Sequence, residues 1–290
     1  MTARTTPPAT GEAITRLREI SDRFDHVLLD QWGALHEGKG LFPDAKACVA
    51  ALQAAGKRVL VLTNSGRPSE ENVRRLTGLG LSPDSYDGAL SSGEVARRGL
   101  RDRKAPPFTQ VGRRCFLISR GGDRTVVEGA GLDLVSLEAA EFILLSGLDD
   151  DASDLDSWRT RLAAAAARKL PMLCANPDLT MFGATGLIPA PGALGAVYEE
   201  LGGTVDYIGK PHRPIFAAAL ESLGDPAPDR VLMIGDSLDH DILGGRAAGL
   251  LTLLIASGVH REALATGADL AGLAGSAARM PHWVIDRLVW

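Results

Sequence analysis

The sequence has no excess of basic residues. Lysine and arginine number 31 against 36 aspartates and glutamates, which gives a formal net charge of −5. Proteins that bind the phosphate backbone of nucleic acids usually carry a basic face or stripe, so we expect no nucleic-acid partner. A small phosphorylated ligand is still compatible with this charge, because a bound divalent cation can supply positive charge locally.

Cysteines and long apolar runs are also scarce. Cys48, Cys115 and Cys174 are far apart and lack a metal-binding spacing, so we expect buried thiols in a reducing compartment. The longest uncharged run, near residues 247–259, is too short to span a bilayer. Residues 1–11 show no apolar core of the signal-peptide type and resemble a frayed tail. We therefore expect no membrane association and a cytoplasmic location.

Four short apolar runs, each followed by polar residues, organise the chain. They are residues 27–29 before Asp30, 59–62 before Thr63-Asn64-Ser65, 205–208 before Gly209-Lys210, and 231–234 before Gly235-Asp236. Continuous apolar runs fit strands buried on both faces, as in a parallel sheet covered by helices, which we expect over 44–55, 69–79 and 213–223. Because the carboxyl ends of parallel strands share one sheet edge, where ligands bind, we expect the four polar clusters to converge there.

A long insertion separates the second cluster from the third. Its length of roughly 140 residues exceeds any simple crossover, and it has a pattern of its own, with strands expected near 115–119, 142–146 and 171–175 and a helix over 157–169. We predict an α/β protein whose core comprises residues 1–100 and 205–290. Residues 101–204 would form an inserted α/β domain able to close over the site.

The polar clusters contain the residue types that a cation and a phosphate group need. Asp30 and Asp236, at neighbouring strand ends, offer oxygen ligands of the kind that Mg²⁺ prefers, and Asp241 can support them. Lys210 can balance surplus negative charge and bind phosphate. Thr63, Asn64 and Ser65 offer short polar donors where a helix begins. Any one of these alone is an ordinary turn or cap residue; their order and strand context together indicate a site.

The motifs resemble those of a known family. Asp30-Gln31-Trp32-Gly33-Ala34-Leu35, Leu62-Thr63-Asn64-Ser65, Gly209-Lys210-Pro211 and Gly235-Asp236-Ser237 with Asp241 are similar to the four motifs of the haloacid dehalogenase-like hydrolases. The long insertion, Ala175-Asn176-Pro177-Asp178 and Pro191-Gly192-Ala193-Leu194-Gly195 resemble the class IIA branch, whose large cap follows the second motif. The resemblance covers nearly the whole chain after about residue 20 and implies a three-layer Rossmann-like core with a parallel sheet plus an inserted α/β cap.

The resemblance also implies roles for individual residues. Asp30 would attack phosphorus and become an aspartyl phosphate, while the backbone carbonyl of Trp32 and the carboxylate of Asp236 would join it around Mg²⁺. Asp241 would support the metal loop, and Thr63 and Lys210 would bind and orient the phosphoryl group, with Asn64 nearby. Apart from the resemblance, we expect Ser65 to offer a further donor to the phosphoryl group, and the loop from residue 176 to 186, with Asn176 and Asp178, to face the substrate. The implied function is a phosphatase or phosphotransferase for a small phosphorylated metabolite. The oligomeric state stays open, with a homo-oligomer as one option.

Trp32 departs from the family pattern. The first motif usually has a second aspartate two residues after the nucleophile, which protonates the leaving group and then activates water. Tryptophan can do neither, and such general acid–base help is typically worth about 10²–10⁴-fold.

Three explanations of Trp32 stay open. His36 or Glu37 could stand in as the acid, the substrate could carry a good leaving group, or the protein could be a catalytically weak metabolite-binding or regulatory protein on the same scaffold. The ring itself could pack against the cap or stack on a substrate. Carbon–halogen hydrolysis, which also occurs in the superfamily, fits the metal-type fourth motif and the large cap less well.

Overall fold

The chain forms two compact units in a computed structural model that describes residues 11–149, 154–183 and 186–290. The first unit comprises residues 1–63, 73–89 and 216–290, and the second comprises residues 64–72 and 90–215. Most of the tail expected over residues 1–11 lies outside the described ranges. The predicted domain boundaries after residues 100 and 204 stay a prediction.

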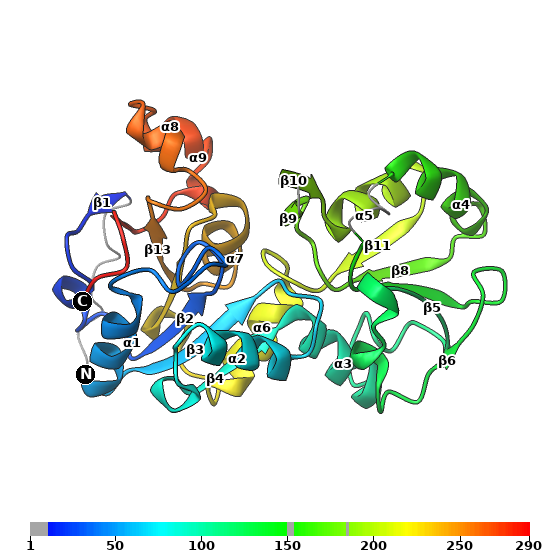
Figure 1. Cartoon of the computed structure of the whole chain (residues 1–290), viewed down its shortest axis with the longest axis horizontal. Helices are drawn as coiled ribbons and strands as arrows, with labels where there is room; N and C mark the ends of the chain where they lie inside the picture. Colours follow the sequence, from blue (N-terminus) through cyan, green and yellow to red (C-terminus); the bar gives the residue numbers. More distant parts are fainter. Residues whose placement is uncertain (1–10, 150–153, 184–185) are drawn as a thin grey trace. The chain divides into compact units, whose positions relative to one another are not determined.

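The first unit is built on a seven-stranded sheet (Figure 1). Its order is β1-β14-β13-β12-β2-β3-β4, and the pairs from β1 to β3 are parallel. The strands are β1 (Glu12–Ala13), β2 (His26–Asp30), β3 (Arg58–Thr63), β4 (Gly88–Ser91), β12 (Val231–Gly235), β13 (Leu251–Ile255) and β14 (Trp283–Ile285). Three of the four predicted runs therefore lie in this sheet or end at its edge.

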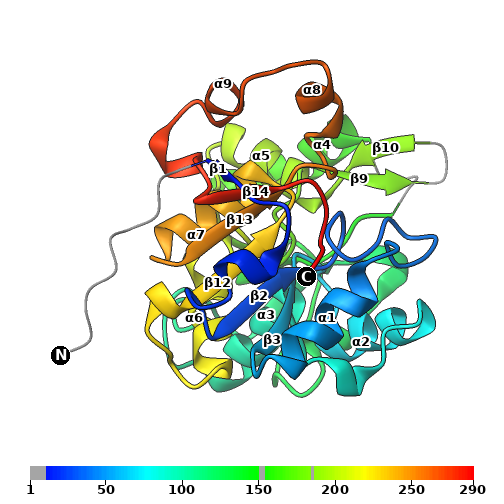
Figure 2. The ribbon, with the colours of Figure 1, turned by 90° about the vertical axis from the view of Figure 1, so that its left-hand side faces the viewer.

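Helices connect the strands of this sheet along the chain. They are α1 (Ala45–Ala54), α2 (Ser69–Gly78), α6 (Arg213–Ser222), α7 (Leu243–Ala247), α8 (Arg261–Ala265) and α9 (Leu270–Ala274), of which α2 and α6 cross between the units. The β2-α1-β3 and β12-α7-β13 crossovers run in opposite directions along the sheet, so right-handed connections place α1 and α7 on opposite faces, as Figure 2 shows. On the α1 face, Leu52 belongs to the same buried cluster as Val27 and Leu29.

The second unit contains a parallel sheet of its own. Its order is β11-β8-β7-β5-β6, and every pair is parallel. The elements are α3 (Ser92–Asp102), β5 (Arg114–Ile118), β6 (Asp133–Leu134), β7 (Phe142–Leu145), α4 (Leu155–Ala167), β8 (Pro171–Cys174), an antiparallel hairpin of β9 (Thr180–Gly183) and β10 (Gly186–Pro189), α5 (Pro191–Glu200) and β11 (Thr204–Tyr207). Trp158 and Leu162 of α4 share a buried cluster with Leu194 and Tyr198 of α5. The predicted α/β insertion is confirmed.

One strand joins a different sheet from the one expected. The run 205–208 forms most of β11, which pairs with β8 in the second unit, so the expectation that all four runs end at one sheet edge is wrong for this run. Asp206 interrupts the run and β11 is only half-buried, as suits an edge strand. Conversely, the run 247–259, which we considered only as a membrane candidate, contains the buried strand β13.

The expectation that the three cysteines are buried free thiols is confirmed. Cys48, Cys115 and Cys174 are buried free thiols, and burial raises the pKa of Cys48 and Cys115 to about 12, so both stay protonated at neutral pH. In the described part of the chain, no helix has both the length and the apolar character needed to cross a membrane.

Candidate functional site

Three aspartates meet at the carboxyl edge of the first unit's sheet. Asp30 ends β2, Asp236 directly follows β12, and Asp241 lies in the helical turn η7 (Leu238–Ile242). One carboxylate oxygen of each residue lies within 4.8 Å of the other two, and the residues are 7%, 3% and 0% exposed. Buried like charges at this spacing repel one another unless a cation lies between them. An all-oxygen set of this kind fits a hard divalent cation such as Mg²⁺.

The strand pairing explains why these carboxylates meet. β2 and β12 are parallel neighbours with Leu29 opposite Ile234, so the next residues, Asp30 and Gly235, end at the same level and Asp236 follows at once. The backbone N–H of Val259 donates to Asp236 Oδ2 at 2.9 Å and fixes the orientation of that carboxylate.

Glycines leave room for the two later aspartates. A Cβ at Gly33, which has φ +85°, or at Gly258 would overlap the side chain of Asp236, and one at Gly235 would overlap that of Asp241. The backbone N–H of Ser237 also donates to Asp241 Oδ2 at 3.1 Å. The acidic cluster is therefore closely packed by backbone, and its carboxylates have little freedom to move apart.

The indole of Trp32 lies in a slot formed by residues of its own unit. The His36 ring meets it edge-on with ring centroids 5.4 Å apart, and the guanidinium carbon of Arg75 lies 5.4 Å from its ring centroid. Gly38 has φ +97°, and a Cβ there would come within 2.9 Å of the indole. The structure thus shows a packed aromatic ring at the position where the family pattern has an acid.

His36, the predicted substitute acid, is buried inside the loop that follows β2. The residue is 0% exposed, and burial lowers its pKa to about 4, with a smaller contribution from Arg75. Its Nδ1 accepts a hydrogen bond from the backbone N–H of Gly38 at 3.1 Å, so Nε2 carries the proton of the neutral ring.

The other ring nitrogen of His36 faces Gln31. Its Nε2 lies 3.1 Å from Gln31 Nε2, while Gln31 Oε1 is buried without a hydrogen-bond partner among the described residues. Turning the Gln31 amide by 180° would let Oε1 accept the Nε2 proton. This arrangement favours a structural role for His36, whose role as an acid remains an untested prediction. Glu37, the other proposed substitute, is exposed.

Thr63 ends β3, the strand beside β2. Asp30 lies opposite Leu62 in the register, so Thr63 comes one residue beyond the level of Asp30 on the adjacent strand. Thr63 is half-buried. This placement suits the predicted contact with a phosphoryl group, which stays a prediction.

Asn64 and Lys210 are joined in the second unit although 146 residues separate them. The backbone N–H of Lys210 donates to Asn64 Oδ1 at 2.7 Å, and Asn64 Nδ2 donates to the carbonyl of Lys210 at 3.0 Å. The Asn64 side chain therefore pairs with one residue's backbone through both its oxygen and its nitrogen. Both residues are buried, with 6% and 3% exposed.

Asp178, predicted to face the substrate, also contacts Asn64. Asn64 Nδ2 donates to Asp178 Oδ1 at 2.8 Å, and the backbone N–H of Asp178 donates to Asn176 Oδ1 at 3.0 Å. The predicted residues Asn64, Asn176, Asp178 and Lys210 are thus brought together in one network. Whether any of them touches a substrate stays a prediction.

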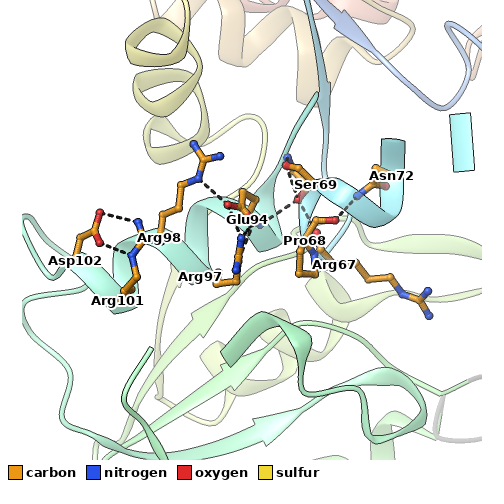
Figure 3. Close-up of polar contacts among 10 residues, drawn as sticks. Arg67, Pro68, Ser69, Asn72, Glu94, Arg97, Arg98, Arg101 and Asp102 are labelled. Atoms are coloured by element: carbon orange, nitrogen blue, oxygen red, sulfur yellow. Dashed lines mark hydrogen bonds and ion pairs between the residues drawn. The ribbon is translucent and has the colours of Figure 1, made fainter. Parts of the chain in front are cut away.

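The loop that follows Asn64 is fastened to the start of helix α3 (Figure 3). The Oγ of Ser91, the N-cap of α3, donates to the carbonyl of Arg67 at 2.5 Å, and the backbone N–H of Ser91 donates to Ser69 Oγ at 3.0 Å. A Cβ at Gly93 would overlap the backbone of Gly66. These contacts hold the loop backbone against the helix end.

The first turn of α3 carries a buried carboxylate. Glu94 is 3% exposed, and its backbone N–H donates to the N-cap Ser91 Oγ at 3.0 Å. Arg97 donates to both of its carboxylate oxygens at 3.0 Å, and Arg98 donates to Oε1 at 2.7 Å (Figure 3). Two guanidinium groups therefore offset the buried charge, which makes this helix start a well-ordered anchor.

A parallel sheet with an acidic cluster at its carboxyl edge, together with a second parallel sheet inserted in the chain, defines the class of protein. Residues 27–133 match the family model described as haloacid dehalogenase-like hydrolase, and residues 207–289 match the one described as HAD-hydrolase-like. With the similarities that follow, the chain belongs to the haloacid dehalogenase-like hydrolase superfamily.

The chain is similar to relatives over almost its whole length. Human chronophin is 30% identical over 285 residues, covering 94% of this chain and 93% of that protein. Dihydroxyacetone phosphatase from Corynebacterium glutamicum (strain R) is 26% identical over 241 residues, covering 81% of this chain and 82% of that protein. The crystal structure of a haloacid dehalogenase-like hydrolase from Brucella suis 1330 matches with a TM-score of 0.81 and 32% identity, covering 95% and 100% of the two chains. These relatives confirm the predicted class IIA branch.

Sequence reasoning missed several residues that shape the site. Gly258 and Val259 follow β13 and fix the carboxylate of Asp236, while Gln31 holds His36. A signal for the first pair was present, because Ser257-Gly258 ends an apolar run in the same way that polar residues end the other core strands. Local sequence contains no signal for Gln31, because its role depends on the path of the loop.

Proposed function

We propose that this protein is a magnesium-dependent phosphatase that hydrolyses a small phosphorylated metabolite with Asp30 as the nucleophile. The buried cluster of Asp30, Asp236 and Asp241 carries the proposal, because three carboxylates within 4.8 Å of one another suit a divalent cation. Membership of the superfamily and similarity to a protein named dihydroxyacetone phosphatase support hydrolysis of a phosphate ester.

The proposed cation site uses oxygen atoms of the first unit. The carboxylates of Asp30 and Asp236 and the backbone carbonyl of Trp32 would hold Mg²⁺, and Asp241 would support the loop. When bound, the ion would offset the negative charge of the phosphoryl group and of the carboxylates around it. The ring of Trp32 does not interfere with this role, because the proposed ligand is its backbone.

The proposed reaction has two steps. A carboxylate oxygen of Asp30 bonds to phosphorus while the bond from phosphorus to the leaving-group oxygen breaks, and the released oxygen takes a proton from solvent. Water then attacks phosphorus, and the products are inorganic phosphate and the free carboxylate of Asp30. Thr63, Ser65 and Lys210 would bind the phosphoryl oxygens and so stabilise the charge that spreads over them.

A second candidate function follows from Trp32. The indole is packed between His36, Gly38 and Arg75, at the position where the family pattern has the aspartate that assists the leaving group. A protein without that help could serve as a metabolite-binding or regulatory protein with little turnover.

Phosphate release separates the two functions. Purified protein with Mg²⁺ and p-nitrophenyl phosphate should release phosphate, EDTA should stop the release, and Asp30→Asn should reduce it by at least about 10³-fold, because the nucleophile is lost. Wild type and Asp30→Asn that are equally inert on aryl, acyl and alkyl phosphates, yet bind one of them, would establish the binding function instead.

A further inference from the structure

We propose that Asn64 and Asp178 are positioning residues that fix the backbone of Lys210. Asp178 would hold the amide of Asn64, and that amide would hold the peptide groups on both sides of Lys210. The inference rests on the proposed function in one respect, since it assigns the Lys210 ammonium to the phosphoryl group. It gives Asp178 a role other than the substrate contact expected from sequence.

The side-chain amide of Asn64 is fully engaged by protein groups. Its oxygen accepts from the Lys210 N–H at 2.7 Å, one N–H donates to the Lys210 carbonyl at 3.0 Å, and the other donates to Asp178 Oδ1 at 2.8 Å. The orientation of the amide is unambiguous, because a flipped amide would set its N–H groups against the Lys210 N–H and its oxygen against two acceptors. Both N–H groups of this amide donate to protein acceptors, so neither is left to donate to a phosphate.

Asp178 is itself held in a rigid turn. Its N–H donates to Asn176 Oδ1 at 3.0 Å, and its carbonyl accepts from the N–H of Gly192, in the first turn of α5, at 2.9 Å. Pro177 packs so closely on Gly209 that a Cβ at Gly209 would lie 2.6 Å from the Pro177 ring. The backbone of this turn is therefore held by Asn176 within the turn and by Gly192 and Gly209 on two other segments.

The network joins segments that are far apart in the chain and fastens each of them. Asn64 lies 114 residues from Asp178 and 146 from Lys210. The loop after Asn64 is anchored on the N-terminus of α3, because Ser91 Oγ donates to the carbonyl of Arg67 at 2.5 Å. A change at Asp178 would then reach Lys210 through the Asn64 amide.

Loss of the Asp178 carboxylate should be costly for catalysis. It would leave a buried N–H of Asn64 without its acceptor, and the amide would turn or shift to find another partner. Because Asn64 also pairs with both backbone groups of Lys210, the shift would move the lysine, and a displacement of about 1 Å at a reacting group can cost about 10²-fold in rate.

Asp178→Asn distinguishes positioning from direct contact with substrate. It keeps an oxygen that can accept from Asn64 but removes the negative charge, whereas Asp178→Ala removes both. As a matched control we choose Glu141→Ala, which also deletes a carboxylate of the second unit that accepts backbone hydrogen bonds, at 2.8 Å from Arg113 and 3.0 Å from Arg114. Glu141 lies at the amino end of the parallel sheet, and Asp178 follows its carboxyl end.

Steady-state kinetics with p-nitrophenyl phosphate form the first arm of the test. Asp178→Ala should lower kcat about 10–100-fold with a smaller change in KM, while Asp178→Asn and Glu141→Ala should stay within about 3-fold of wild type. If Asp178→Asn lowers kcat as much as Asp178→Ala does, the carboxylate acts through its charge and the proposal is overturned. This comparison holds even where Asp178→Ala folds poorly, because Asp178→Asn keeps the acceptor.

Hydrogen exchange at the Lys210 amide forms the second arm and does not depend on activity. This amide should be protected in wild type and in Asp178→Asn, and should exchange at least about 10-fold faster in Asp178→Ala, with Glu141→Ala unchanged. Equal protection of the Lys210 amide in all four proteins would overturn the proposal that Asn64 and Asp178, the positioning pair, fix the backbone of Lys210. If wild type releases no phosphate but the exchange changes as expected, the proposed function fails and the positioning pair stands.

Discussion

At the scale of single residues, the acidic cluster brings together carboxylates that repel one another. Its neighbour Trp32 has no acidic or basic group. Asp30, Asp236 and Asp241 are buried together, which is tolerable when a cation lies among them. Trp32, two residues after Asp30, contributes a packed ring in place of an acid. The site therefore has no acid at the position from which the family pattern protonates the leaving group.

Activity should depend steeply on the leaving group because Trp32 cannot donate a proton. We expect kcat/KM for aryl and acyl phosphates to exceed that for alkyl phosphates by at least about 10²-fold, the usual worth of general acid help. A series of substrates with leaving groups of graded pKa measures this dependence. Trp32→Asp should raise the alkyl activity if the loop keeps its shape, and equal rates across the wild-type series would refute the expectation.

The acidic residues could be predicted from sequence, but the packing around them could not. Asp30 and Asp236 were expected side by side because they end neighbouring parallel strands, and the structure has them so. His36 was one candidate for the missing acid because it lies just beyond the first motif. The chain turns back there, with the N–H groups of Leu35 and His36 directed to the Gln31 carbonyl, which buries the ring. Residue order contains no signal for that reversal.

At the scale of elements, His282 fastens α7 and β13 to the start of β14. Its Nδ1 lies 3.0 Å from both the N–H and the Oγ1 of Thr252 in β13, and its Nε2 lies 2.7 Å from Arg246 Nη1 in α7. A guanidinium only donates, so Nε2 accepts from Arg246 and Nδ1 carries the proton of the neutral ring, with Thr252 Oγ1 as an acceptor. A second proton, on Nε2, would face the guanidinium. Burial, together with the charges of Arg246 and Arg23, lowers the pKa of His282 to about 4.

This histidine should make the fold less stable in mild acid. The ordinary pKa of 6.5 applies to the unfolded chain and about 4 to the folded one, so the unfolded state binds more protons between these values and stability falls as pH drops from 6.5 towards 4. Between pH 7 and pH 4, we expect the free energy of unfolding to fall by about 3 kcal/mol less in His282→Asn than in wild type. Urea unfolding across this range measures the difference, and parallel pH profiles for the two proteins would contradict it.

Strand positions followed from apolar runs, whereas strand partners did not. The runs before Asp30 and Asp236 became the buried strands β2 and β12 of one sheet. The run before Lys210 became β11 of the other sheet, although it is also followed by a glycine and a charged residue. Pairing is decided by contacts distant in sequence, and the only local sign was Asp206, which suits an edge strand.

At the scale of the whole molecule, the predicted functional residues are divided between two parallel sheets. The acidic cluster and Thr63 belong to the first unit, while Asn64, Asp178 and Lys210 belong to the second. The sequence motifs predicted the α/β class, the insertion and the family. The assignment of Lys210 to the second unit depends on long-range contacts that the motifs do not contain.

Calorimetric titration with Mg²⁺ tests the central claim, that the three carboxylates form a cation site, most directly. Wild type should bind one Mg²⁺, and Asp236→Asn should bind it at least about 10-fold more weakly, because a carboxylate ligand is lost while the size of the side chain is kept. Glu141→Ala, with a carboxylate removed elsewhere, should bind as wild type does. Equal affinity of wild type and Asp236→Asn, or no binding by wild type, would contradict the account.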